Sequence, residues 1–577
     1  MKNYLLIALF FVFAYVIPST GRPMMRPDEF RYGEIPTEMI ELGDYTTPRL
    51  LGGRYFEKPP LGYWVTAGAI RLFGHTPFAV RFMSLFGAAG AALLIAAWVR
   101  RSTRDDLPAA LAAILYLGCG LVYGLGTVAV LDSLLSCFTT GTLVCLFFAL
   151  EERRFSRRRI AFALLAGVFA GLAFLTKGFI AFAIPALTAA LYLVVERRWR
   201  EFLLLPPLVL VGVLVVALPW ALRIHAAEPD FWRYFVIEEH WKRFTDGTDQ
   251  HPSPWWILTP ILIGGSFPAA LMLVAAADAE TGRLRQLLRQ PLVRFAAAGV
   301  VMPLIFFSVS RGKLPTYIAP CYGPLAVLMA LAVAAGLEDG RKRFFDYAMI
   351  GWGILITVGG AGTVLFAALI RWSSLCRKLF PALEGAEFFF AAIGIVGFLC
   401  GLTAIAMRRR SRRDRFVFFW AAWGFGLAAS VLLPDFHSGK MPEKMLYRFV
   451  RPAWKVDPAV DRVFCYSSSA HAVAWCVGGS RTRLLSAGEF EYGDREARKR
   501  GEEPLVWSRA ELRRLIDDPA RRCGVVLISD EEKDLPSFMA KDPALQSCRS
   551  GEFIAWRIPP REREVPAKPA AAGSSPR

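Results

Sequence analysis

Charged side chains, histidine and metal-binding cysteine motifs are scarce in this 577-residue chain, which has only six histidines. Charged residues make up 20% and hydrophobic residues 55%, with a mean hydropathy of +0.38. That balance excludes a soluble globular protein and an intrinsically disordered one. The ten cysteines form no Cys-x-x-Cys pair and no Cys/His ligand spacing, which excludes a zinc ribbon or an iron–sulfur cluster held by such a motif. The composition indicates a polytopic membrane protein.

Long apolar runs recur along the chain and predict membrane-spanning helices. The N-terminal run is followed by no small-residue cleavage site, so we expect an uncleaved first helix rather than a signal peptide. A span needs about 17–25 mainly apolar residues. Runs of that length predict thirteen spans, and we find no internal repeat among them. The spans lie near 4–19, 78–98, 107–124, 130–150, 160–176, 179–195, 203–223, 255–277, 293–309, 315–336, 347–370, 386–407 and 416–433.

Most of the net charge of +19 comes from short basic loops between the apolar runs. With the N-terminus in the cytoplasm, six cytoplasmic loops hold 24 Arg and Lys against 11 Asp and Glu, a balance of +13. Cytoplasmic loops of membrane proteins carry such a basic excess. The charge therefore predicts membrane orientation, not a nucleic-acid-binding surface. The loops are 100–106, 151–159, 196–201, 278–294, 338–343 and 408–415.

Three segments then face the outside of the membrane. Two are loops within the transmembrane domain 1–433, at 20–77 and 224–254, and the first is far longer than a connector requires. The third, residues 434–562, has a soluble composition and predicts a small α/β domain, followed by a disordered tail at 563–577.

Four apolar segments of this C-terminal domain predict strands, and one amphipathic segment predicts a helix. The strands are DRVFCYSSS, HAVAWCVGG, RCGVVLISD and EFIAWRI, and the helix is SRAELRRLIDDP. Four cysteines of the domain are able to pair in an oxidising compartment, although their spacing selects no pairing. They are Cys465, Cys476, Cys523 and Cys548.

Ionisable residues lie at the outward-facing ends of several predicted spans. Asp132 begins the fourth span, Lys177 joins the fifth to the sixth, and Arg311 and Lys313 join the ninth to the tenth. A charge at the centre of a membrane helix costs about 2.5–3.5 kcal/mol, so each needs a role. For Lys177 and Arg311 we favour snorkelling to the interface, and Asp132 suits a helix cap and a functional site equally. Their clustering on one side favours an active site at the outer surface over the midplane site of a transporter.

The first outer loop contains the most informative motif, RPDEFRYGEIPTEMIELGDYTTPRLLGGRYFEKPPLGYW at 26–64. Asp28 and Glu29 form an acidic pair just after the first span. The stretch EIPTEMIELG predicts a helix that ends at Gly43 as a C-cap.

Further along this loop, Tyr55, Glu57 and Lys58 stand beside two prolines. Carboxylates, a lysine and a tyrosine near a lipid surface suit chemistry on a phosphate-bearing lipid, because lysine supplies a point charge and tyrosine a directional donor. The alternative is an amphipathic interfacial loop with ordinary surface charges.

The second outer loop contains EEHWKRFTDGTDQHPSPWW at 238–256. His240 and Arg243 are three positions apart, so they share one face if this segment is helical. The pattern fits either a metal ligand beside a phosphate clamp or an aromatic-belt segment. His251 precedes Pro-Ser-Pro, which favours a turn into the eighth span.

The first-loop motif closely resembles the first periplasmic loop of bacterial lipid A 4-amino-4-deoxy-L-arabinose transferases, the ArnT family. That family belongs with the protein O-mannosyltransferase-like, GT-C membrane glycosyltransferases. The resemblance runs through most of residues 1–325, with further matches at LDSLLSCF, LTKGFIAFAIPAL, EHWKRF and SRGKLPTYIAP. It implies a polytopic all-α fold of GT-C type with about thirteen transmembrane helices and a small periplasmic α/β domain.

The resemblance also implies an enzyme of the bacterial inner membrane whose active site faces the periplasm. Such an enzyme moves a sugar, here 4-amino-4-deoxy-L-arabinose, from an undecaprenyl phosphate carrier to a lipid A phosphate, with inversion in a single displacement. One alternative keeps the fold but transfers another sugar to protein, glycan or lipid. A more distant alternative is a lipid flippase or transporter.

Site residues follow from the resemblance motif by motif. It implies two catalytic aspartates, four residues that bind the donor phosphate, and a pair that holds a divalent metal such as zinc. These are Asp28 and Asp132; Lys58, Arg243, Tyr317 and Tyr55; and Glu57 with His240. Contact with the amino group of the sugar has three candidates, which are Glu29, Glu34 and Asp44.

Overall fold

In the computed structural model, the chain forms two compact units. One unit comprises Met1–Pro48 and Tyr55–Gly439, and the other comprises Arg49–Arg54 and Lys440–Arg577. A short piece of the first outer loop thus groups with the C-terminal unit. The domain boundary expected after residue 433 and the tail from 563 lie outside the described residues. Those residues are 2–242, 253–267, 270, 273, 283–338, 343–379, 387–407, 410–429, 446–447, 449, 456, 461–479 and 482–561.

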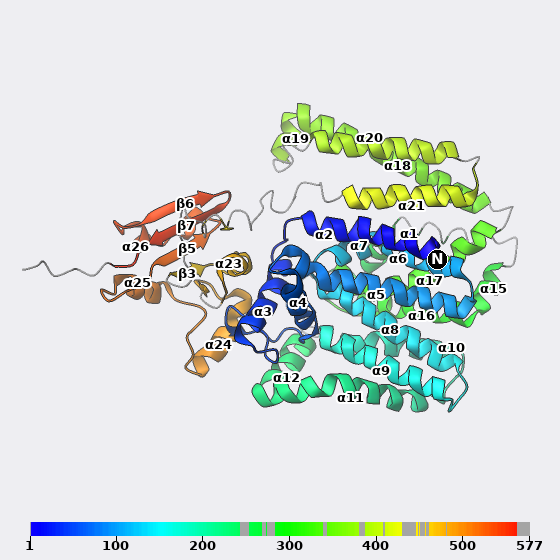
Figure 1. Cartoon of the computed structure of the whole chain (residues 1–577), viewed down its shortest axis with the longest axis horizontal. Coiled ribbons are helices and arrows are strands. Elements are labelled where there is room, and N and C mark those ends of the chain that lie inside the picture. The colour runs from blue at the N-terminus through cyan, green and yellow to red at the C-terminus, as the bar shows by residue number, and fades with distance from the viewer. Residues whose placement is uncertain are drawn as a thin grey trace, which may run out of the picture. The chain divides into compact units, whose positions relative to one another are not determined.

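The larger unit is a bundle of long apolar helices (Figure 1), which confirms the polytopic all-α class. In the described part of the chain, nine helices are long and apolar enough to cross a membrane. The number is ten if α6 (Asp106–Leu117) and α7 (Gly120–Thr127), bent by 66°, form one span. The nine are Tyr4–Gly21, α5 (Pro77–Thr103), α8 (Leu131–Glu151), α9 (Arg157–Lys177), α11 (Glu201–Ala227), α16 (Pro291–Val309), Pro315–Ala335, Ile350–Trp372 and α20 (Glu387–Ala406).

The remaining predicted spans coincide with shorter or more polar helices, so the count of thirteen stays a prediction. The helix α10 (Ile180–Val195) is shorter than the others, and α14 (Leu258–Gly265) covers part of the eighth predicted span. At the thirteenth, α21 (Arg412–Ala429) begins in a basic segment.

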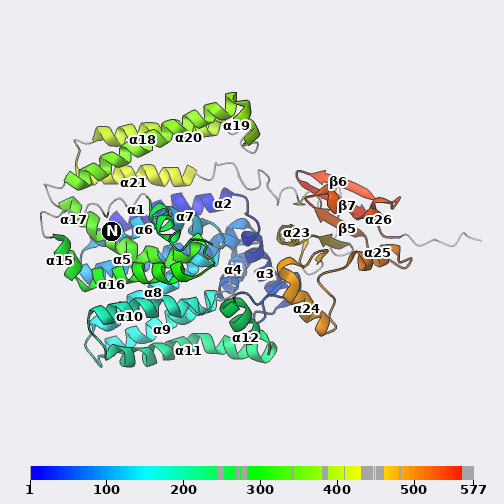
Figure 2. The ribbon, with the colours of Figure 1, turned by 180° about the vertical axis from the view of Figure 1, so that it is seen from behind.

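Glycines allow neighbouring helices of the bundle to approach closely. Gly167 of α9 faces α11, where a Cβ on it would lie 2.0 Å from the backbone oxygen of Val209. Likewise, Gly360 of α18 (Arg343–Trp372) faces Gly394 of α20, and both views show these two helices side by side (Figures 1 and 2). Such close contacts replace the hydrophobic driving force, which is weak between helices in lipid.

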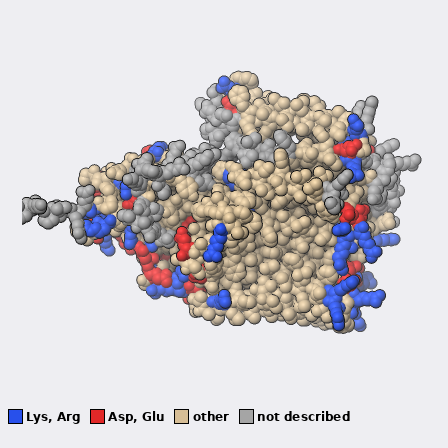
Figure 3. Space-filling model, viewed as in Figure 1, with Lys and Arg blue, Asp and Glu red and all other residues tan. Residues whose placement is uncertain are grey.

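Basic side chains gather at one end of the bundle. On the face shown in Figure 3, Lys and Arg lie at the end that carries the N-terminus. This agrees with the predicted basic loops, because the chain returns to one membrane side after every second span.

The outer loops are largely helical. In the first loop, α3 (Asp28–Leu42) begins at the aspartate, earlier than expected, and ends at Gly43, whose φ of +67° confirms the predicted cap. The helix α4 (Leu61–Phe73) follows the two prolines. The described part of the second loop forms α12 (Phe231–Arg233) and the π-helix η2 (Tyr234–Lys242).

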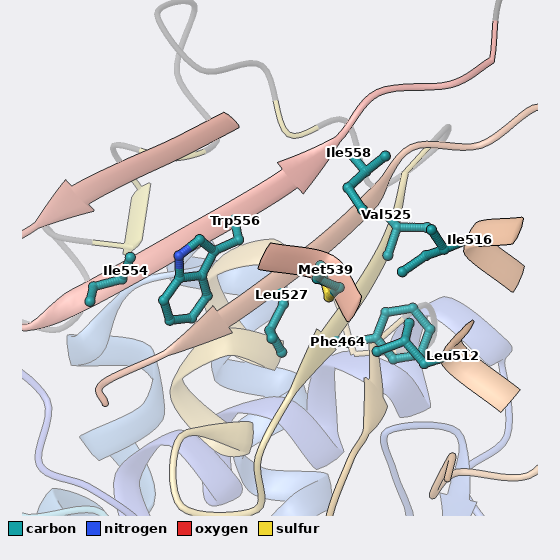
Figure 4. Packing of buried hydrophobic residues seen from close by; sticks show 9 residues of the cluster. All are labelled: Phe464, Leu512, Ile516, Val525, Leu527, Met539, Ile554, Trp556 and Ile558. Carbon is teal, nitrogen blue, oxygen red and sulfur yellow. The ribbon is translucent and has the colours of Figure 1, made fainter. Parts of the chain in front are cut away.

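The C-terminal unit contains a five-stranded sheet of order β4-β3-β5-β7-β6. Its strand β3 (Arg462–Cys465) pairs in parallel with β4 (Thr482–Leu484) and β5 (Val525–Ser529), whereas β7 (Phe553–Ile558) is antiparallel to β5 and β6 (Gln546–Ser550). Helix α25 (Arg509–Asp517) packs Leu512 and Ile516 into the core together with Trp556 and Phe464 (Figure 4). The predicted α/β class of this unit is therefore confirmed.

One predicted strand of this unit is wrong. The segment HAVAWCVGG forms the helix α23 (Ala470–Val477), and all eight of its residues are buried. A short, uniformly apolar run has neither the period of a strand nor that of a helix, so burial on every side leaves the two indistinguishable from sequence. In the described part of the chain, the four cysteines able to pair form no disulfide with one another.

Candidate active site

A buried ion pair fixes the start of the first outer loop. The carboxylate of Glu29 accepts hydrogen bonds from Nε and Nη2 of Arg81, each at 2.7 Å, and neither side chain has exposed surface. Arg81 also donates to the backbone oxygens of Ser19, Arg22 and Pro23, which uses all five of its N–H groups. Burial by itself raises the pKa of a carboxyl, but the Arg81 charge outweighs it and the pKa of Glu29 lies below its ordinary value.

Glu29 reaches a second segment of the site as well. It accepts the backbone N–H of Ala129 at 2.9 Å, three residues before Asp132. The same carboxylate therefore connects the neighbour of Asp28 with the start of α8. This role excludes Glu29 as the contact for an amino sugar. Asp44, another candidate, accepts the N–H groups of Thr46 and Thr47.

Asp28 is not part of that buried pair. Its side chain is 50% exposed and lies 3.7 Å from the guanidinium of Arg31, which stands 5.9 Å from the ring centre of the buried Tyr55. Asp28 and Tyr32 are one helical turn apart in α3. Burial, the neighbouring Tyr63 and the charges of Asp28 and Asp132 hold the pKa of Tyr32 well above its ordinary value. The negative charges of both predicted aspartates therefore disfavour the ionised form of the Tyr32 hydroxyl.

Asp132 forms the centre of a second group of side chains. The Nζ of Lys177 lies 2.6 Å from Asp132 Oδ1 and 5.7 Å from the ring centre of Tyr317. The three residues come from the start of α8, the end of α9 and the 3-10 helix η5 (Pro315–Cys321). Lys177 does not snorkel to solvent as expected, since its side chain is only 19% exposed. A carboxylate partner explains why it stays inside.

Lys58 is held by an acidic residue of the second outer loop. Its Nζ lies 2.5 Å from Glu239 Oε1 and 4.0 Å from Glu57 Oε2. Glu239 is 6% exposed, so this ammonium bridges the two outer loops in a largely buried position. The side chains of His240 and Arg243 lie outside the described residues. Within the described ones, no group of three or more His, Cys, Asp or Glu is placed to hold a metal ion.

The sequence gives little or no signal for four residues of this site. Arg31 and Tyr32 stand three and four positions after Asp28, so helical spacing from that aspartate was the available signal. Lys177 carried the signal of a charge next to a predicted span. Glu239 carried none, because its partner lies 181 positions away along the chain.

The chain is similar to known membrane glycosyltransferases. Residues 1–235 match the family described as dolichyl-phosphate-mannose-protein mannosyltransferase. The undecaprenyl phosphate-alpha-4-amino-4-deoxy-L-arabinose arabinosyl transferase of Serratia proteamaculans is 36% identical over 431 residues, which cover 74% of each chain. The chain belongs to this arabinosyl transferase family. A further family member, from Proteus mirabilis, is 34% identical and covers 85% of this chain and 86% of its own.

A crystal structure of ArnT from Cupriavidus metallidurans bound to undecaprenyl phosphate has the same fold. The TM-score is 0.78 over 96% of this chain and 97% of the other, at 23% identity. The arabinosyl transferase fold therefore extends through both units of the chain, including the C-terminal one. Membership in the arabinosyl transferase family makes the chain an integral-membrane glycosyltransferase, which excludes the transporter alternative.

Proposed function

We propose that this chain transfers 4-amino-4-deoxy-L-arabinose from an undecaprenyl phosphate carrier to a phosphate of lipid A. The relatives' names supply the sugar and the carrier. One observation supports the site: a carboxylate, an ammonium and a phenol converge at Asp132, Lys177 and Tyr317, from three separate elements. The alternative of another sugar on the same fold has support from the mannosyltransferase family match, but that match ends at residue 235.

The reaction takes place at the periplasmic side of the inner membrane. Asp132 lies in the first turn of α8, whereas the basic loop 151–159 follows its last turn. A helix of this length extends about 30 Å, the thickness of the hydrocarbon core. The site and the basic loops therefore belong to opposite membrane surfaces, and basic loops favour the cytoplasm.

Catalysis rests on stabilising the departing phosphate of the carrier. An oxygen of the lipid A phosphate attacks the anomeric carbon, and the bond from that carbon to the carrier phosphate oxygen breaks with its electron pair. Lys58, Arg243, Tyr317 and Tyr55 surround this phosphate in our assignment, with Lys177 beside Tyr317. Fixed cations and donors lower the barrier because charge develops on the leaving oxygens. A single displacement inverts the configuration.

The two aspartates have different environments and hence different roles. Asp28 is half exposed, so an incoming acceptor reaches it directly. An ionised acceptor phosphate needs no general base, and Asp28 then orients the acceptor or the amino group of the sugar. Asp132 is buried against Lys177 and holds that ammonium towards Tyr317.

We further propose that Glu57 and His240 hold a divalent metal such as zinc between the two outer loops. The oxygen and nitrogen donors fit that ion. Glu57 is 15% exposed in its side chain, and the Lys58–Glu239 pair already brings the loops together next to it. When bound, the metal would supply positive charge near the carrier phosphate and fix the loops to each other.

Lipid A mass spectrometry tests the proposed transfer. Cells that lack the gene receive wild type, Asp28→Asn or the control Asp517→Asn, a surface position in α25 whose side chain is 64% exposed. We expect one added aminopentose with wild type and the control, and none with Asp28→Asn at equal protein level. A modified protein or glycan with unchanged lipid A would replace the proposed acceptor by another.

A further inference from the structure

A two-stranded hairpin in the first outer loop belongs to the C-terminal unit. Its strands β1 (Arg49–Leu50) and β2 (Gly53–Arg54) pair antiparallel, and Leu51 and Gly52 form the turn with φ values of +57° and +79°. Residues on both sides of the hairpin, up to Pro48 and from Tyr55, belong to the helical unit. The chain thus passes into the C-terminal unit and back just before Tyr55, Glu57 and Lys58.

The hairpin is bound to the C-terminal unit through a paired charge. The guanidinium of Arg54 donates to both carboxylate oxygens of Glu502, at 2.8 and 3.1 Å. Arg54 is 7% exposed, whereas the Glu502 side chain is 44% exposed. Bidentate pairs of this kind define orientation as well as distance. The Arg54 hydrogen bonds hold the pKa of Glu502 below its ordinary value, and the charges of Arg49 and Arg500 contribute.

Close packing surrounds this pair. A Cβ at Gly53 would lie 2.2 Å from Leu505 Cδ1, so the side chain of Leu505 rests directly on β2. Gly493 of α24 (Glu491–Lys499) approaches the backbone oxygen of Arg54, 3.0 Å from where its own Cβ would stand. Leu51 at the turn is fully buried although its φ is unfavourable for a side chain, which indicates that the surroundings impose this conformation.

The base of the hairpin is held by the helical unit. The indole N–H groups of Trp64 and Trp220 donate to the backbone oxygens of Tyr45 and Thr46, at 2.8 and 3.1 Å. The N–H of Tyr55 donates to the oxygen of Pro48 at 2.9 Å and closes the base. A segment held at its base and its tip has little freedom, and Tyr55 to Lys58 follow it immediately.

We propose that the C-terminal unit positions the donor-binding segment Tyr55–Lys58 through the Arg54–Glu502 pair. Arg54 and Glu502 are positioning residues, since neither needs to touch the substrate. The inference rests on the proposed function for its effect on catalysis, but not for the pairing itself. It assigns the C-terminal unit a part in the binding of the lipid-linked donor.

Two measurements on the purified full-length protein in lipid nanodiscs test this proposal. The first is hydrogen–deuterium exchange, which needs no activity. Glu502→Gln is expected to speed exchange of the backbone amides of residues 49–58 about tenfold, the effect of losing about 1.4 kcal/mol. The control is Glu503→Gln, because Glu503 pairs with Arg462 and Arg483 within the C-terminal unit. It should leave exchange in residues 49–58 as in wild type.

The second measurement is transfer kinetics with a lipid-linked aminoarabinose donor. Arg54→Gln and Glu502→Gln should each raise KM for the donor about five- to tenfold while kcat stays within about twofold. The double variant should be no worse than either single one, because both remove the same interaction. Equal exchange in Glu502→Gln and wild type, or additive effects on KM, would overturn the proposal. If wild type transfers no aminoarabinose but Glu502→Gln still loosens residues 49–58, the pairing stands and the proposed function fails.

Discussion

Removing the guanidinium of Arg81 should damage both the fold and the active site. The Arg81–Glu29 pair has no exposed surface, and Glu29 also accepts the N–H groups of Met25 and Ala129. In Arg81→Met, the carboxylate stays buried without its cation, and three backbone oxygens lose their donor. Breaking a buried pair in this way costs about 3–5 kcal/mol, a large share of the stability of an ordinary domain.

The assay is the apparent melting temperature of the purified protein, followed by tryptophan fluorescence. Because the entropy of unfolding scales with chain length, a loss of this size corresponds to a fall of about 3–5 °C in a chain this long. The matched control is Arg100→Met, because Arg100 pairs with Asp106 at 2.8 Å but both side chains are more than half exposed. Exposed pairs contribute about 0–1 kcal/mol, so the control should melt within about 1 °C of wild type.

A double variant separates the charge from the packing. Arg81→Met with Glu29→Gln removes both charges, so it should melt above Arg81→Met alone. Transfer should stay low in the double variant, because Glu29 and Ala129 no longer align Asp28 with Asp132. Melting of Arg81→Met at the wild-type temperature would refute the argument that this pair supports the loop.

Further predictions concern the site, the hairpin, the metal and the bundle. Lys177→Met should lower kcat of transfer about 100-fold, because it removes a preorganised cation beside Tyr317. It should also lower the melting temperature, because Asp132 then stays buried without its cation. Folding lowers the pKa of Glu502, so the stability that its pair with Arg54 contributes is complete above the ordinary pKa of glutamate, about 4.3. That stability is lost as the pH falls through the lower pKa of the folded state. In acid, hydrogen exchange of residues 49–58 in wild type should therefore approach the exchange seen in Glu502→Gln. Glu57→Gln should lower the zinc content per protein measured by elemental analysis, and equal zinc in variant and wild type would remove Glu57 from the ligands. Gly167→Leu should abolish stable folded protein in size-exclusion chromatography, because its side chain meets the α11 backbone.

The aspartates and lysines of the site show which of its features the sequence predicts and which it does not. The resemblance predicts Asp28, Asp132, Lys58 and Tyr317, and in the structure Lys177 lies 2.6 Å from Asp132 and 5.7 Å from the ring centre of Tyr317. The predicted snorkelling of Lys177 is wrong, because a lysine at the end of a span has the same local sequence whether it faces solvent or a carboxylate. Its partner Asp132 lies 45 positions away, beyond any local pattern.

The sequence alone determined the membrane class, the basic side, the capped helix at Gly43 and the family. These depend on composition and on spacing within a few residues, where hydrophobicity and helical geometry act directly. Tertiary structure alone decided that Glu29 is buried against Arg81 while its neighbour Asp28 is exposed, that HAVAWCVGG is a helix, and that the hairpin 49–54 joins the C-terminal unit. Each of these depends on partners distant in the chain, because burial and charge pairing are set by what packs nearby in space.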